Sequence, residues 1–257
     1  MQESFFEQVG PGSYRATKAT AGPWSADAQH GGPPSALAAR ELELHEPAAH
    51  MRLARVSIDI LRPVPIQTLR VTAKTVRPGK RVTLLEAVAE ADGQEVLRAR
   101  GWRIARSDTP MVSKDVAVPA IPAASTKFRF PGGNADGYLS QIDWRFVAGS
   151  LDQPGPCQAW GRPRIPLLPG EELTPMSRTL LLADSGSGLS MAIDPTRFIF
   201  INVDLTVILQ RDPIGEWLLL DAHTTMGGTG TGLAETTISD TTGVAGAAIQ
   251  TLLVAHR

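Results

Sequence analysis

The chain has 257 residues, 42% of them hydrophobic and 20% charged, with a formal net charge of −1. This balance lacks the basic footprint of nucleic-acid or acidic-membrane binding, and a single cysteine, Cys157, excludes an intrachain disulfide. No apolar run approaches the roughly 20 residues of a membrane span, and the N-terminus is unlike a signal peptide. We therefore expect a soluble, cytoplasmic protein without membrane insertion.

The first half begins with short strands and one helix. Residues 5–20 are predicted to form a strand pair turned at Gly10-Pro11-Gly12. His30-Gly31-Gly32-Pro33-Pro34 opens a helix that runs to about Leu44, because proline is favoured in the first helical turn. The residues of this helix are mostly small, which suits close packing against a sheet. Four longer strands are expected at 53–61, 68–77, 81–91 and 95–104.

The second half repeats this order after a proline-rich stretch, 108–135, which is typical of a linker. Strands are expected at 142–147 and 157–166. A helix from Thr174 to about Ala192 follows, with Thr174 as N-cap and Pro175 in the first turn. Further strands are expected at 199–210, 216–226, 229–239 and 244–255. We thus predict an N-terminal domain over 1–107 and a C-terminal domain over 136–257.

The two halves also correspond residue by residue. Arg62 lies 149 positions before Arg211 and Glu86 lies 149 before Glu235, while 150 separate Gly93 from Gly243. The spacing is too long for a solenoid repeat, so it indicates two fused copies of one domain with a one-residue loop insertion.

Several motifs can be set aside. The glycine-rich run 227–232 lies between two strands, whereas a phosphate-binding loop precedes a helix. Residues 184–188 do not fit the G-x-S-x-G elbow of hydrolases. The five histidines lack the spacing of a metal site, and Cys157 is interpreted as a buried structural thiol.

Three features remain as site candidates, each with an alternative. His30-Gly31-Gly32 at a helix start offers backbone amides to a ligand, or is simply a tight turn. Asp184 in an apolar helical stretch is a functional carboxylate, or an exposed or structurally bonded one. Gln250 in the last apolar strand is functional, or faces outward.

The chain resembles the type II acyl-CoA thioesterases and their thioesterase-like relatives over nearly its whole length. The resemblance lies in order and spacing. In the first half it rests on His30-Gly31-Gly32, residues 58–63 and Ala99-Arg100-Gly101-Trp102; in the second, on Leu182-Ala183-Asp184, 202–206, 213–218 and Gln250. It implies an α+β double hotdog, two tandem domains each with a long central helix wrapped by an antiparallel sheet.

The resemblance also implies a site. In that family an Asp, a Thr or Ser and a Gln hold a water that attacks the thioester carbonyl. The Asp falls on Asp184 and the Gln on Gln250, whereas the family's Thr falls at Asn202, which has no hydroxyl. Thr206 is a substitute if it shares the strand face of Asn202, as period-two alternation predicts.

This chemistry needs only a positioned water, a base and oxyanion donors, so no metal or organic cofactor is expected. With an offset of 150, Gln250 corresponds to Arg100, and the polar set exists only in the second half. We therefore expect one retained site in a duplicated fold.

The leading hypothesis is hydrolysis of acyl-CoA to free acid and CoA. A non-catalytic acyl-CoA binding module is the first alternative, because Asn202 replaces the hydroxyl residue. Hydration or dehydration of an acyl thioester is a second, although the D-x-N-x-x-H-like stretch common in such enzymes does not occur. A monomer and a homo-oligomer are both compatible with a double hotdog.

Overall fold

The computed structural model describes residues 3–112, 116–124 and 136–257. Its first half contains two short strands, a 3-10 turn at Lys18–Thr20, a helix and four long strands. In order the main elements are β1 (Phe6–Gly10), β2 (Ser13–Ala16), α1 (Gly32–Leu44), β3 (Met51–Ile60), β4 (Thr68–Arg77), β5 (Val82–Ala91) and β6 (Gln94–Ala105). Each lies within a few residues of its predicted bounds.

The second half begins with a 3-10 turn at Tyr138–Gln141. It continues with β7 (Ile142–Ala148), β8 (Cys157–Pro163), α2 (Pro175–Ala183), α3 (Gly186–Leu189), β9 (Phe198–Asn202), β10 (Asp204–Leu209), β11 (Leu218–Met226), β12 (Thr231–Asp240) and β13 (Gly243–His256). Thr174 caps α2 as predicted, its Oγ1 accepting from Ser177 N at 3.1 Å.

Two predicted elements of this half are wrong in their continuity. The helix expected over 174–192 is divided at Asp184 and Ser185 and ends at Leu189, and the strand expected over 199–210 is divided at Val203. Both interruptions lie beside the candidate site.

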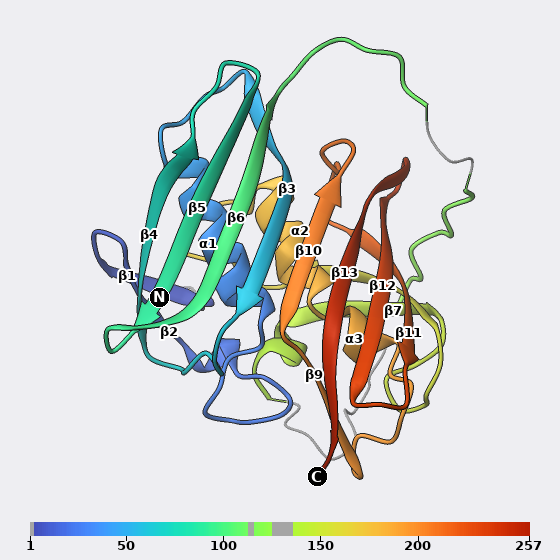
Figure 1. The fold of residues 1–257 in the computed structure, drawn as a ribbon. Helices are drawn as coiled ribbons and strands as arrows, with labels where there is room; N and C mark the ends of the chain where they lie inside the picture. The colour runs from blue at the N-terminus through green and yellow to red at the C-terminus, as the bar shows by residue number, and fades with distance from the viewer. Residues whose placement is uncertain (1–2, 113–115, 125–135) are drawn as a thin grey trace.

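The strands of the two halves join edge to edge in one antiparallel sheet. Their order is β1-β2-β4-β5-β6-β3-β10-β13-β12-β11-β8-β7, and β9 also pairs with β13. The halves meet where β3 pairs with β10, between Asp59–Arg55 and Asp204–Ile208. Figure 1 shows this sheet in front of the helices. A half-sheet with its own helix, present twice, is the double hotdog architecture.

The helices lie together against one face of this sheet. α1 contacts β3, β4, β5 and β6, α2 contacts β8, β10 and β11, and the two helices contact each other. Ala36, Leu37, Ala38 and Ala39 are fully buried, so the small side chains of α1 do let it pack closely, as predicted.

The predicted linker lies partly outside the described residues. Its described parts, 108–112 and 116–124, contain no helix or strand. The domain boundaries therefore stay a prediction.

Candidate active site

A cavity of about 380 Å³ opens between the two copies of the domain. The first copy contributes the loop before α1 and the turn after β3, and the second contributes the α2–α3 junction and β9. Its apolar lining includes Trp24, Ile60, Leu61, Val64, Leu139, Trp144, Leu151, Leu189, Phe200, Ile201 and Val203. Its polar lining includes Gln29, His30, Arg62, Asp184 and Asn202. The cavity is therefore an apolar chamber with a small polar centre, as small-molecule sites commonly are.

Asp184 sits at the break between α2 and α3, and the side chain of Gln250 causes that break. Gln250 Nε2 donates to the backbone carbonyl of Asp184 at 3.1 Å. Gln250 Oε1 accepts from Ser187 N at 3.0 Å. A side chain inserted into the hydrogen-bond ladder interrupts a helix. Gln250 from β13 therefore determines that the helix is interrupted at Asp184.

Gln250 is buried and is absent from the cavity lining. It contacts the backbone of Asp184 rather than its carboxylate. Gln250 therefore reaches the site only through the backbone beside Asp184.

His30 meets Asp184 across the boundary between the copies. Its Nδ1 lies 3.0 Å from Asp184 Oδ2, in a setting where both side chains are largely buried. The imidazole stacks on the ring of Tyr138, with 3.8 Å between ring centroids and 13° between planes. Tyr138 is held in turn by its hydroxyl, which donates to Leu181 O at 2.8 Å.

Sequence reasoning assigned His30 to substrate binding and missed both contacts. No local signal could have revealed them, because His30 and Asp184 belong to different copies and Tyr138 precedes a strand.

Asn202 lies on the other side of the carboxylate. Its Nδ2 donates to Asp184 Oδ1 at 2.8 Å and to Asp204 O at 3.1 Å. Both amide hydrogens are thus used within the protein. Asn202 Oδ1 has no donor among the described residues, so it can accept a hydrogen bond from a water in the cavity.

Thr206 does not join this group, and the prediction that it shares the face of Asn202 is wrong. Asn202 pairs with Leu252, which is 1% exposed, whereas Thr206 pairs with Ile249, which is 45% exposed. Asn202 and Thr206 are four positions apart in the sequence, whereas their partners Leu252 and Ile249 are three positions apart. The extra residue, at Val203, forms a β-bulge. A one-residue shift turns the following side chains to the opposite face.

Gly31 and Gly32 also have a packing role, which the sequence did not predict. A Cβ on Gly31 would lie 2.8 Å from Asp184 Oδ2, and one on Gly32 would lie 2.3 Å from Leu181 O. The two glycines therefore let α1 approach the end of α2. The backbone N–H of Gly31, which lines the cavity, has no acceptor among the described residues.

The surroundings of Asp184 keep its carboxylate ionised. Burial alone would raise the pKa of Asp184. The charge and hydrogen bond of His30, with hydrogen bonds from Asn202 and the Gly32 backbone, outweigh burial and hold that pKa below its usual value. An ionised Asp184 accepts a hydrogen bond and so fixes the orientation of the imidazole.

The equivalent place in the first copy is apolar. The register of the paired strands shows a constant offset of 149, because Ser57 and Arg100 pair as Thr206 and Ile249 do. The turn Ala91–Gln94 likewise matches Asp240–Gly243. The expected one-residue insertion is therefore wrong.

With this offset, Gln250 corresponds to Gly101 rather than to Arg100, and Asn202 corresponds to Leu53. A Cβ on Gly101 would lie 2.9 Å from both Leu42 and Leu53. Leucines of α1 and β3 thus fill the place where the second copy has its polar group.

Other candidate chemistry is sparse in the part of the chain that the structure describes. No group of three or more His, Cys, Asp or Glu side chains is arranged to hold a metal ion. Burial raises the pKa of the Cys157 thiol to about 12, with a further contribution from Asp221, so this thiol stays protonated. None of the described helices combines the length and apolar character needed to cross a membrane.

Comparison with known proteins agrees with this architecture. The family model for the acyl-CoA thioesterase N-terminal domain matches residues 20–104, and that for the acyl-CoA thioesterase C-terminal domain matches 113–254. No curated protein is detectably similar in sequence.

Solved structures share the fold at low sequence identity. A hotdog-fold protein of unknown function from Alicyclobacillus acidocaldarius has a TM-score of 0.75 and 16% identity, covering 95% of this chain and 92% of its own. Acyl-CoA thioesterase II TesB2 from Mycobacterium marinum has a TM-score of 0.69 and 17% identity, covering 98% and 95%. The tesB protein of Mycobacterium avium subsp. paratuberculosis has a TM-score of 0.66 and 17% identity, covering 97% and 96%.

Proposed function

Because the chain belongs to the acyl-CoA thioesterase family, we propose that it hydrolyses an acyl-CoA thioester to a free acid and CoA. The contact between His30 and Asp184 in an apolar cavity carries this proposal. Hydrolysis of a thioester needs a base beside a bound water and an apolar place for the acyl group, and the cavity offers both.

In the proposed mechanism His30 is the general base. In the neutral imidazole the mechanism places the proton on Nδ1, which lies 3.0 Å from Asp184 Oδ2. Nε2, without a partner among the described residues, is then free to accept a proton from the attacking water. Asn202 Oδ1 accepts the second hydrogen of that water. The water oxygen bonds to the thioester carbon, and the Gly31 N–H at the start of α1 stabilises the oxyanion.

The tetrahedral intermediate then collapses. The carbon–sulfur bond breaks, the carbonyl re-forms, and His30 returns its proton to the thiolate of CoA. Asp184 supports the imidazolium throughout, and Gln250 keeps Asp184 in place. Every proton is accounted for by His30, water and the thiol.

The direct test is release of free thiol from a panel of short-, medium- and long-chain acyl-CoA substrates. We expect turnover of at least one chain length by the wild-type protein and its loss in Asp184→Ala. No thiol release from any member of the panel would contradict the proposal.

A binding protein without turnover is the competing function, and one observation favours it. Asn202 stands where the family's hydroxyl residue is expected, and its amide hydrogens are both used within the protein. Calorimetry with a non-hydrolysable acyl-CoA thioether separates the two functions. Binding of the thioether together with no turnover of the thioester would support the binding protein.

A further inference from the structure

The same arginine-containing turn occurs once in each copy. After β3, Leu61 N and Arg62 N both donate to Val96 O, at 3.0 and 3.4 Å. After β10, Gln210 N and Arg211 N both donate to Ala245 O, at 2.9 and 3.4 Å. The backbone therefore places Arg62 and Arg211 at equivalent positions.

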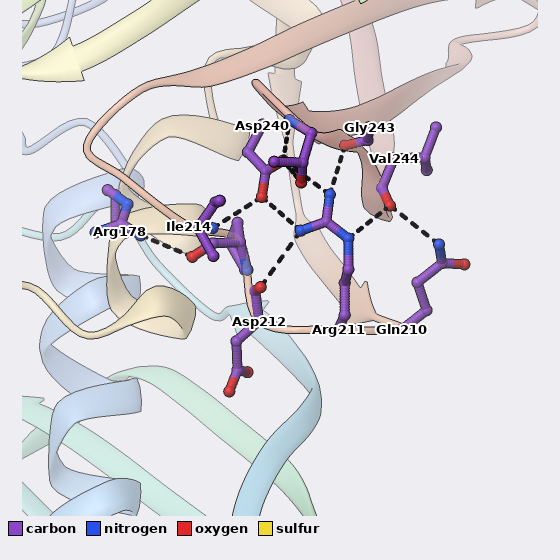
Figure 2. A network of polar contacts seen from close by, with 10 residues as sticks. Arg178, Gln210, Arg211, Asp212, Ile214, Asp240, Gly243 and Val244 are labelled. Carbon is purple, nitrogen blue, oxygen red and sulfur yellow. Dashed lines mark hydrogen bonds and ion pairs between the residues drawn. The ribbon is translucent and has the colours of Figure 1, made fainter. Parts of the chain in front are cut away.

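In the second copy the arginine is held by an ion pair and by backbone carbonyls (Figure 2). Arg211 contacts the carboxylate of Asp240 through both terminal nitrogens, with 2.8 Å between Nη2 and Oδ1. It also donates to the carbonyls of Gly243 at 2.7 Å and Val244 at 3.2 Å. Asp240 is fully buried. This arginine has a structural role and is unavailable to a ligand.

In the first copy the carboxylate partner of the arginine is missing. Asp240 pairs with Gly243 at the β12–β13 turn, and the equivalent residue at the β5–β6 turn is Ala91, which pairs with Gln94. Among the described residues, the Arg62 side chain has no hydrogen bond, ion pair or ring contact. Arg62 is exposed and lines the cavity that contains His30 and Asp184.

A second cation contacts a lining residue of the cavity. The Arg257 guanidinium sits 5.5 Å from the ring centroid of Trp24, which is itself a lining residue. The polar centre of the cavity contains the Asp184 carboxylate, whereas its exposed part includes Arg62. This distribution suits a ligand whose reactive end is neutral and whose other end is anionic.

We propose that Arg62 binds a phosphate group of the CoA moiety at the mouth of the cavity, an inference that rests on the thioesterase function proposed above. CoA carries a pyrophosphate and a ribose phosphate at the end remote from its thiol. A free guanidinium binds such groups with paired hydrogen bonds. Loss of Asp240's counterpart in the first copy is what frees Arg62 for this contact.

The test compares wild-type protein with Arg62→Gln and, as a matched control, Arg70→Gln. Arg70 is an exposed arginine of β4 outside the cavity. Calorimetry with CoA alone measures binding without requiring turnover. We expect the Kd for CoA to rise about tenfold in Arg62→Gln and to stay unchanged in Arg70→Gln. Dephospho-CoA, which lacks the ribose phosphate, then separates the two phosphate sources. With this ligand the difference in Kd between wild type and Arg62→Gln disappears only if Arg62 binds the ribose phosphate.

Kinetics supply the second readout. With an acyl-CoA, Arg62→Gln is expected to raise KM about tenfold at unchanged kcat. With the same acyl group on pantetheine, which has no phosphate, wild type and Arg62→Gln are expected to have equal KM values. Equal Kd values for CoA, or an equal rise in KM for both thioesters, would overturn the inference. If the wild-type protein hydrolyses neither thioester, the proposed function fails, while CoA calorimetry still decides the role of Arg62.

Discussion

His30 of the N-terminal copy and Asp184 of the C-terminal copy meet with 3.0 Å between Nδ1 and Oδ2. The acid–base pair therefore exists only where the two copies pack together, and neither half carries the site alone. Each copy supplies half of the sheet and its own helical segment, and the proposed chemistry depends on the boundary between the copies.

Removing the imidazole tests its proposed role as base. His30→Gln is expected to lower kcat by about 10²–10⁴-fold. His223→Gln is the control, because His223 is exposed on β11. A thiol-release assay on the best acyl-CoA measures both, and wild-type kcat in His30→Gln would exclude His30 as the base.

Gly31→Ala tests the close approach of α1 to Asp184. The added Cβ would lie 2.8 Å from Asp184 Oδ2, closer than such contacts allow, so the carboxylate must shift away from His30. We expect kcat to fall by at least tenfold while the free energy of unfolding changes by about 1 kcal/mol. Gly93→Ala, at an open turn far from the site, serves as control for kcat. Unaltered kcat in Gly31→Ala would show that the position of Asp184 is not critical.

The ion pair between Asp240 and Arg211 predicts a loss of stability in acid. Burial opposes ionisation of Asp240, but hydrogen bonds from Arg211, Thr242 and Ile214 N prevail and hold its pKa far below the usual value. A depressed carboxyl pKa stabilises the fold above the unfolded pKa, near 4, and this contribution is lost as the pH falls.

Asp240→Asn is expected to lower the free energy of unfolding by about 3 kcal/mol at pH 7, with a smaller difference from wild type at pH 3. Urea denaturation at pH 7, 5 and 3 measures the difference. If the difference in free energy of unfolding between wild type and Asp240→Asn stayed constant across this pH range, Asp240 would not be the titrating group.

Glu43 predicts the opposite pH dependence. Burial, with the charge of Asp212, raises its pKa to about 7 against a hydrogen bond from Thr174. A raised carboxyl pKa means that the folded state binds the proton more tightly than the unfolded state. The stability it contributes is therefore lost as the pH rises from about 4.5 to 7.

Glu43→Gln keeps an acceptor for the Thr174 hydroxyl, which donates at 2.7 Å, and carries no charge. The variant is expected to be more stable than wild type at pH 8 and similar to it at pH 4.5. Thermal unfolding at the two pH values measures this, and equal unfolding temperatures at pH 8 would contradict the raised pKa.

Local signals in the sequence were sufficient for the order of elements. Thr174-Pro175 identifies the start of α2, and Asp92-Gly93 takes the positive φ values of 50° and 73° that its hairpin turn requires. These features depend on neighbouring residues alone, so a single sequence is enough to predict them.

The details of the site depend on contacts between distant residues. Gln250 breaks the helix at Asp184 from a strand far along the chain, and no helical periodicity records such an insertion. The bulge at Val203 turns Thr206 outward, whereas strict alternation predicts one continuous face. His30 and Asp184 were each singled out in the sequence, but only the packing of the two copies joins them.

The most direct measurement of the central claim is kcat for Asp184→Asn with the best acyl-CoA substrate, alongside the Kd of the same variant for CoA. Asparagine keeps the shape of the side chain and removes the charge that orients His30. We expect kcat to fall by about 10²–10⁴-fold while the Kd for CoA is unchanged. Wild-type kcat in Asp184→Asn would contradict it.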